Sequence, residues 1–175
     1  MTNPAKIKGD QTEREALAWI ATGWPHLLRP NAMRMLGAGR RDDIGDLSAI
    51  DDVVIQVKAS NPRTLTAALR AAAHGAAAQR VNAAARFEMG LTKYPNARGG
   101  SVRWLATSLV WPGPVEAVLD AGAAVSKAVV FVRDEAGPAR TDRVAVVHGR
   151  GLPVMYLAPA EAWMSAFEHA AAVAA

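Results

Sequence analysis

The chain has 175 residues, 51% of them hydrophobic, a formal net charge of +4 and no cysteine. This length and composition suit one compact domain with a sizeable core, and the lack of cysteine excludes disulfide frameworks, cysteine–zinc sites and thiol nucleophiles. The charged N-terminal stretch and the lack of a long apolar run exclude a signal peptide and a membrane span, so we expect a soluble, intracellular protein.

The first part of the chain predicts a helix followed by a basic and less regular segment. Residues 10–22 predict the helix, because Thr12 and Glu15 have capping-box spacing and Leu17 and Ile20 form an apolar stripe. Prolines and glycines interrupt residues 24–41, which therefore predict an irregular or partly extended segment.

A β-hairpin and an alanine-rich helix are expected next. Alternation predicts strands over residues 46–50 and 53–59, joined by a turn at Asp51-Asp52. Residues 63–89 predict a helix whose many alanines indicate close packing against a neighbour. Residues 94–125 fit two short helices or a strand and a helix, and we interpret them as an insertion. Within them Trp104 and Trp111, seven residues apart, favour one buried helical stripe or a dimer contact, and stacking on unpaired bases is the alternative.

The C-terminal part predicts strands over residues 128–133, 143–148 and 152–157, and a final helix over residues 160–173. The order of the elements predicts an α/β fold, in which a mixed β-sheet carries helices on both faces. We expect a single domain spanning residues 1–175.

Asp46, Gln56 and Lys58 form the strongest candidate site in the sequence. Alternation puts Gln56 and Lys58 on one face of their strand, with Ile55 and Val57 on the other. A two-residue turn would set Asp46 opposite Val57, on the wrong face, whereas an odd loop or one bulge sets it opposite Gln56 or Lys58. Only the second register makes one face of the hairpin apolar and the other catalytic, and burial fixes register strongly.

This layout is the one that metal-assisted hydrolysis of a phosphodiester needs. Asp46 and Gln56 offer oxygen ligands to a hard cation such as Mg²⁺, and Lys58 can orient the attacking water or stabilise the developing oxyanion. Glu13 shares the stripe of Leu17 and Ile20 and therefore points towards the sheet. We expect Glu13 to reach the metal directly or through water.

At these residues the sequence resembles the archaeal-type Holliday-junction resolvases and their bacteriophage relatives, within the PD-(D/E)xK nuclease superfamily. The matching pieces are Lys8-Gly9, Glu13-Arg14-Glu15, Gly45-Asp46 and residues 54–58, all within roughly the first ninety residues. The resemblance implies a restriction-endonuclease-like fold and a homodimer that cuts branched DNA with Mg²⁺ or Mn²⁺ during DNA recombination. It also implies a cytoplasmic location, in the host cell if a phage encodes the protein.

The sequence departs from this family at Gln56, where the usual residue is glutamate or aspartate. A glutamine carbonyl can ligate a cation, but it brings no negative charge. Three functions therefore stay open. The first is a junction-resolving endonuclease, and the second is an Mrr-like restriction endonuclease, which the Gln-x-Lys variant also resembles. The third is a catalytically weakened nuclease-fold protein that only binds DNA.

Arginines on both sides of the hairpin are the expected contacts to the DNA backbone. Four lie before the hairpin, in a stretch without acids, and two follow it: Arg29, Arg34, Arg40, Arg41, Arg63 and Arg70. The alternative is a solvated surface in a protein of arginine-rich composition.

Overall fold

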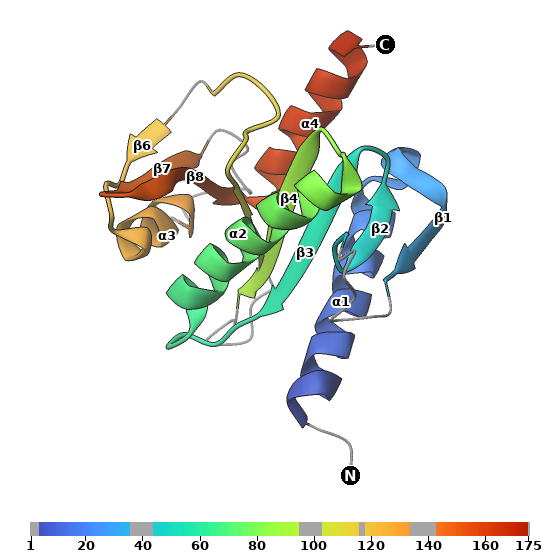
Figure 1. The fold of residues 1–175 in the computed structure, drawn as a ribbon, viewed down its shortest axis with the longest axis horizontal. Coiled ribbons are helices and arrows are strands. Elements are labelled where there is room, and N and C mark those ends of the chain that lie inside the picture. Colours follow the sequence, from blue (N-terminus) through green and yellow to red (C-terminus); the bar gives the residue numbers. More distant parts are fainter. Residues whose placement is uncertain (1–3, 36–43, 95–102, 116–117, 134–142, 175) are drawn as a thin grey trace.

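A computed structural model of the chain describes residues 4–35, 44–94, 103–115, 118–133 and 143–174. Within these ranges the chain forms four α-helices and one mixed sheet of eight strands (Figure 1). The helices are α1 (Pro4–Gly23), α2 (Leu65–Ala83), α3 (Val125–Arg133) and α4 (Ala160–Ala174), and a short 3-10 helix, η1 (Pro25–Leu27), precedes the first strand. The strands are β1 (Leu28–Arg34), β2 (Leu47–Ile50), β3 (Val53–Ala59), β4 (Phe87–Tyr94), β5 (Arg103–Ser108), β6 (Val118–Asp120), β7 (Val144–Gly149) and β8 (Leu152–Pro159).

The sheet joins antiparallel and parallel pairs in the order β1-β2-β3-β4-β5-β8-β7-β6. β1, β2 and β3 are antiparallel, and α2 then returns the chain so that β4 lies parallel to β3. β5 pairs antiparallel with both β4 and β8, and the parallel pair of β6 and β7 completes the far edge. The candidate hairpin of β2 and β3 therefore lies near one edge of the sheet, beside the crossover through α2.

Helices cover both faces of the sheet (Figure 1). α1 and α4 pack on the face that carries Ile55, where Ile20 of α1 and Trp163 of α4 are wholly buried. α2 and α3 pack on the opposite face, where Leu69 of α2 and Val125 of α3 belong to a second core cluster. This arrangement confirms the predicted mixed α/β architecture with helices on both faces.

α2 approaches the sheet closely because small residues line its inner face. Ala72 and Ala76 are wholly buried. A Cβ atom added to Gly90 of β4 would lie 2.6 Å from the backbone carbonyl carbon of Ala72 and 2.5 Å from Oγ1 of Thr107, so glycine is required at this position. The close packing predicted from the alanine-rich sequence is confirmed.

The elements around α2 differ from the sequence prediction in extent. The predicted helix over residues 63–89 ends at Ala83, because Ala84 adopts a left-handed conformation with φ of 51°. The chain then enters β4 at Phe87, a strand that the prediction missed. Residues 28–34, within the segment predicted to be irregular or partly extended, form the edge strand β1.

Residues 128–133 form part of α3, and their prediction as a strand was wrong. The buried residues of α3 are Val125, Ala128, Val129 and Val132, which follow the helical period. Burial of this stripe against β7 and β8 outweighs the strand preference of valine.

Residues 103–108 form β5 in the interior of the sheet, so this part of the predicted insertion belongs to the core of the fold. Trp104 lies in β5 and is only 4% exposed, which assigns it to the core of this chain and not to a helical stripe or a dimer contact. The hairpin strands, β7, β8 and α4 agree with the prediction, and α1 begins earlier, at Pro4.

None of the helices in the described ranges has the length and apolar character that a membrane crossing requires.

Candidate active site

The β2–β3 hairpin has the odd register that the sequence analysis favoured. Asp51 and Asp52 form the turn, and Asp52 has a left-handed backbone with φ of 64°. Leu47 of β2 lies opposite Ile55 of β3, and both side chains are buried on the face covered by α1 and α4. Asp46, which precedes Leu47, is therefore placed on the opposite face, the one that carries Gln56 and Lys58 of β3.

Gly45 and Asp46 lead the chain into β2. Gly45 has φ of 111°, and a Cβ atom there would lie 3.1 Å from the carbonyl oxygen of Ile55. The backbone N–H of Asp46 donates to the same oxygen at 2.9 Å. Glycine thus permits the close approach that sets the Asp46 carboxylate against β3.

The Asp46 carboxylate contacts Gln56 directly. Its Oδ2 accepts a hydrogen bond from Nε2 of Gln56 and another, of 2.8 Å, from the backbone N–H of Val57. Gln56 is only 4% exposed and packs under α2, where a Cβ atom added to Gly75 would lie 3.3 Å from its Cγ. Gly75 lowers the helix propensity of α2 by about 1 kcal/mol relative to alanine, and the space that it leaves is occupied by Gln56.

Lys58 follows Gln56 by two residues and lies on the same face of β3, since side chains alternate along a strand. It is partly exposed, and its neighbour in the sheet is Thr92 of β4. The structure therefore brings Asp46 and Gln56 into contact, with Lys58 further along the same face. This agrees with the register argument made from the sequence.

Glu13 lies elsewhere, which differs from the prediction that it joins this group. Its Oε2 accepts hydrogen bonds from Arg34, 2.9 Å from Nε and 2.5 Å from Nη2, and Nη2 also donates to Asp10 at 2.9 Å. Arg34 is the sheet partner of Leu47, whose side chain is buried against α1, so this ion-pair cluster belongs to the α1 face. Gln56 packs on the opposite face. The apolar stripe of α1 correctly predicted that Glu13 faces the sheet, but not which face α1 covers.

The same cluster removes Arg34 from the expected DNA contacts. Its side chain is 13% exposed and engaged by two carboxylates. Burial alone would lower the pKa of Arg34, but its hydrogen bonds to Glu13 and Asp10 outweigh burial and raise that pKa. Arg34 is thus held as an internal cation that fastens β1 to α1.

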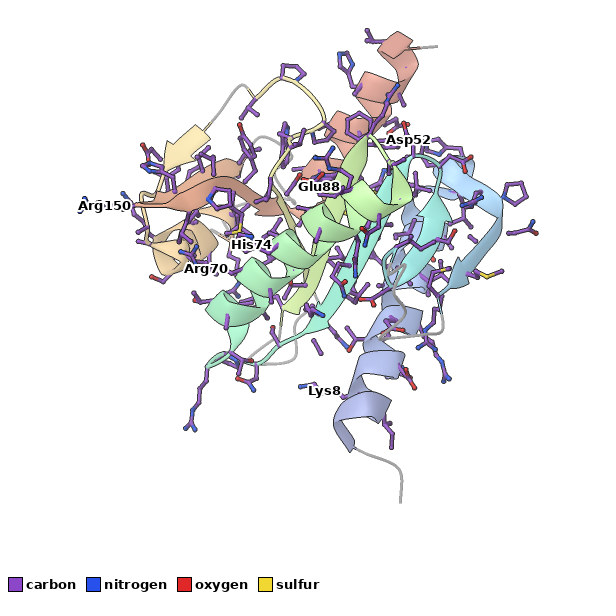
Figure 2. All side chains as sticks on the ribbon, in the orientation of Figure 1. Lys8, Asp52, Arg70, His74, Glu88 and Arg150 are labelled. Carbon is purple, nitrogen blue, oxygen red and sulfur yellow. The ribbon has the colours of Figure 1, made fainter. Side chains whose placement is uncertain are left out.

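The other predicted DNA-binding arginines have different surroundings. Arg29 is exposed on β1, and its Nη1 donates to Oγ of Ser48 at 2.8 Å. Arg63 is exposed in the turn before α2. Arg70 lies on the part of α2 nearer α3 (Figure 2) and donates to the carbonyl oxygen of Ala123 at 3.3 Å. Arg40 and Arg41 lie outside the described residues.

A pocket of about 550 Å³ adjoins the hairpin, on the side of the sheet where α2 ends. Ser48 and Val54 line it from β2 and β3, Arg29 lines it from β1, and Asn82 lines it from the end of α2. Met35 and Ile44 also line it, and the backbone N–H of Met35 donates to the carbonyl oxygen of Asp46 at 2.8 Å. We call this the hairpin pocket.

The sequence analysis missed a buried ion pair between Glu88 of β4 and Arg80 of α2. Glu88 is wholly buried near the C-terminal end of α2 (Figure 2), and its Oε2 lies 2.7 Å from Nε of Arg80. Its Oε1 accepts the backbone N–H groups of Leu109 and Val110 at 3.0 and 2.9 Å. Burial raises the pKa of Glu88, although these hydrogen bonds and Arg80 act in the opposite direction.

Glu88 ties three separate segments together, so we assign it a structural role. It lies in a strand that was itself not predicted, and nothing in the local sequence distinguishes it from a surface glutamate.

The fold and the site together define a mixed α/β protein with a carboxylate–amide pair on a β-hairpin. Within the described ranges, no group of three or more histidine, aspartate or glutamate side chains is arranged to hold a metal ion. Comparisons of the chain with known protein families, with curated proteins and with solved structures give no match.

Proposed function

We propose that the protein is a metal-dependent endonuclease of the restriction-endonuclease-like fold that hydrolyses phosphodiester bonds in branched DNA. The observation that carries the proposal is the contact of Asp46 with Gln56, with Lys58 two residues further along the same face of β3. A mixed sheet in which α2 links β3 to the parallel strand β4 gives this group a rigid support.

The residues fit a hard divalent cation such as Mg²⁺ in the chemistry of their donor atoms. Asp46 offers a carboxylate. Gln56 offers a carbonyl oxygen once its amide group is rotated so that the oxygen, and not the nitrogen, lies beside Asp46. Mg²⁺ keeps several waters and takes oxygens from substrate phosphates, so one carboxylate and one amide can suffice from the protein. When bound, the cation would lower the pKa of a coordinated water and offset charge on the phosphate.

The protein groups have separable roles in this proposal. Asp46 would bind the cation and fix its position, because hydrogen bonds from Gln56 and from the backbone N–H of Val57 hold its carboxylate in place. Lys58 stabilises the charge that develops on the phosphate, since an ammonium group on the same face complements an oxyanion. Arg29, which is exposed and lines the hairpin pocket, contacts a backbone phosphate of the same DNA.

A second candidate function, DNA binding without cleavage, is favoured by two contacts. Gln56 presents its N–H₂ group and not its oxygen to Asp46, which satisfies the carboxylate without a cation. Glu13, the expected second negative group, is neutralised by Arg34 on the other face. A protein with this arrangement retains the fold and its basic surface while its affinity for a metal is low.

Cleavage assays decide between these functions. We expect the protein to cut a four-way junction with Mg²⁺ or Mn²⁺, and we expect Asp46→Asn and Lys58→Ala to abolish cutting while DNA affinity changes by less than about threefold. Asp120→Asn is the matched control, because Asp120 lies on β6 at the far edge of the sheet from the hairpin with a side chain that is 71% exposed. Tight binding without cleavage under either metal would support the binding function instead.

Two further points of the proposal concern the substrate and the assembly. Preference for a junction over a matched linear duplex separates a resolving enzyme from an Mrr-like restriction enzyme. Two symmetric cuts in a junction need two active sites, for which a C2 homodimer is the simplest assembly. Full cutting activity from a protein that light scattering shows to be monomeric would contradict the dimer.

A further inference from the structure

A second pocket lies at the end of the sheet where the parallel strands β3 and β4 finish. It has a volume of about 470 Å³ and is lined by Ala59 at the end of β3, by Ser60 just after it, by Lys93 of β4 and by the N-terminal half of α1. Ala59 and Lys93 are neighbours in the sheet. Ligands of open α/β sheets bind characteristically at the carboxyl ends of parallel strands, and this volume falls within the range of about 300–1,000 Å³ found for small-ligand sites. We call it the strand-end pocket.

The rim of the strand-end pocket carries two lysines. Lys8 is exposed on α1, on the side of that helix that faces the ends of β3 and β4 (Figure 2). Lys93 is held in place by Glu15, which also accepts a hydrogen bond of 3.0 Å from Gln11. The hydrogen bonds from Lys93 and Gln11 lower the pKa of Glu15, so it stays ionised at neutral pH. Two ammonium groups and one carboxylate leave one net positive charge, which a single phosphodiester balances.

The walls of the pocket are apolar. Ala59 lines it from the sheet, and Ile7 lines it from α1 with 53% of its surface exposed. A large apolar side chain exposed beside a lysine offers a surface on which a flat aromatic ring can pack. Gln11 adds an amide at the rim that can hydrogen-bond to the edge of such a ring.

The pocket lies close to the candidate active site along the chain. Ala59 is three residues beyond Gln56 on the same strand, which corresponds to about 10 Å. Stacked nucleotides in one strand of DNA rise by about 3.4 Å each, so this spacing spans about three nucleotides. The pocket lies on the α1 side of the sheet and Gln56 on the α2 side. A strand whose phosphate lies at Asp46 and Lys58 therefore reaches the strand-end pocket by passing around the carboxyl end of β3, a path of at least about three nucleotides.

We propose that the strand-end pocket binds one unpaired nucleotide of the DNA substrate. Its phosphate contacts Lys8 and Lys93, its base packs on Ile7, and Gln11 meets the edge of the base. A base within a duplex is stacked and must be extruded to enter such a pocket, whereas a base at a branch point is already available. The identity of the polymer rests on the proposed endonuclease function, and the pocket supplies a physical reason for selecting branched DNA.

The test measures binding of small probes by NMR in the presence of EDTA, so that it does not depend on cleavage. The probes are the dinucleotide thymidylyl-thymidine, thymidine alone and inorganic phosphate. We expect shifts confined to α1, Ala59, Ser60 and Lys93, and at least tenfold tighter binding of the dinucleotide than of either fragment. Lys8→Gln and Ile7→Ser should each weaken the dinucleotide at least fivefold. Both residues are exposed, so thermal melting should confirm that these variants fold.

The control is Lys127→Gln, which removes an exposed lysine from α3 on the opposite face of the sheet and should leave binding unchanged. Dinucleotide binding at the pocket by a protein that never cuts DNA would support the pocket while the proposed endonuclease function failed. Cleavage of a junction without any dinucleotide binding at this pocket would overturn the nucleotide proposal and leave the endonuclease function standing. Equal affinity for phosphate and dinucleotide would reduce it to an anion site and overturn the nucleotide proposal.

Discussion

Replacing Gln56 by glutamate tests the geometry of the candidate site through protein stability. In the parent the Gln56 amide, which is only 4% exposed, donates to Asp46, whose side chain is partly buried. Gln56→Glu replaces this donor by a second carboxylate. The variant loses a hydrogen bond to a charged group, worth about 1.5–3 kcal/mol. It also gains repulsion between two unit charges, which at about 4 Å and an effective dielectric constant of 20 amounts to about 4 kcal/mol.

The pair can relieve part of this repulsion by binding one proton, so the net loss is smaller than the sum. We expect Gln56→Glu to lower the free energy of unfolding by about 3 kcal/mol in EDTA at neutral pH. For a chain of this length that corresponds to a fall in melting temperature of roughly 6–12 °C. A cation between two carboxylates removes their repulsion, so Mg²⁺ or Mn²⁺ should restore most of the loss in the variant and change the parent much less.

The matched control combines Asp46→Asn with Gln56→Glu, which keeps one amide and one carboxylate with their positions exchanged. We expect the free energy of unfolding of this double variant to lie within about 1 kcal/mol of that of the parent, which gives a large coupling energy in the double-mutant cycle. The measurement is thermal unfolding by circular dichroism for the parent, both single variants and the double variant. Additive effects of the two substitutions, with no response of Gln56→Glu to metal, would refute the reasoning.

Three further predictions concern the fold and the DNA surface. Gly90→Ala should lower the free energy of unfolding by about 3 kcal/mol in chemical denaturation, because the new Cβ meets the backbone of α2. Gly9→Ala, in an open part of α1, should instead raise that free energy by at most about 1 kcal/mol. Glu88 has a raised pKa in the folded protein, so its contribution to stability is full below the unfolded pKa and falls as the pH rises through the folded pKa. Melting curves between about pH 4 and pH 7 should show that Glu88→Gln removes this dependence of the melting temperature on pH. Arg29→Gln should reduce the log–log salt dependence of DNA affinity by about 0.9, measured by fluorescence anisotropy. Arg34→Gln should leave that slope unchanged and cost about 2 kcal/mol of stability, because its carboxylate partners lose their cation.

The hairpin could be predicted from the sequence because its signals are local. Alternation in residues 55–58 separates the apolar side chains of Ile55 and Val57 from the polar side chains of Gln56 and Lys58, and only the odd register puts Leu47 on the apolar side. The contact between Asp46 and Gln56 follows from that register, so the centre of the candidate site needed no tertiary information. The terminal helix was equally accessible, since Trp163 and Phe167 mark its apolar face.

The placement of Glu13 could not be predicted from the same kind of signal. The stripe of Leu17 and Ile20 shows that Glu13 faces the sheet, but a helical stripe does not specify which of two sheet faces it covers. That choice depends on how α1, α4 and α2 share the sheet. Arg34, which binds Glu13, looked like a free surface arginine for the same reason.

Other errors arose where local preference conflicts with tertiary packing. The end of α2 at Ala84 carries no glycine or proline, so the alanine-rich pattern appeared to continue into β4. In α3 the valines favour a strand locally, yet the spacing of Val125, Val129 and Val132 is helical and was a usable signal. Glu88 had no such signal, because a buried glutamate is defined by partners distant in sequence.

The most direct test of the endonuclease proposal is the rate of junction cleavage against Mg²⁺ concentration, measured for the parent, Asp46→Ala, Gln56→Ala and Gln56→Glu. We predict that the parent cuts and that Asp46→Ala does not. Gln56→Ala should need more Mg²⁺ than the parent, and Gln56→Glu should reach half its maximal rate at about tenfold less, which corresponds to about 1.4 kcal/mol of added attraction for the cation. If Asp46→Ala cuts as fast as the parent at every Mg²⁺ concentration, the hairpin is not the active site and the account is wrong.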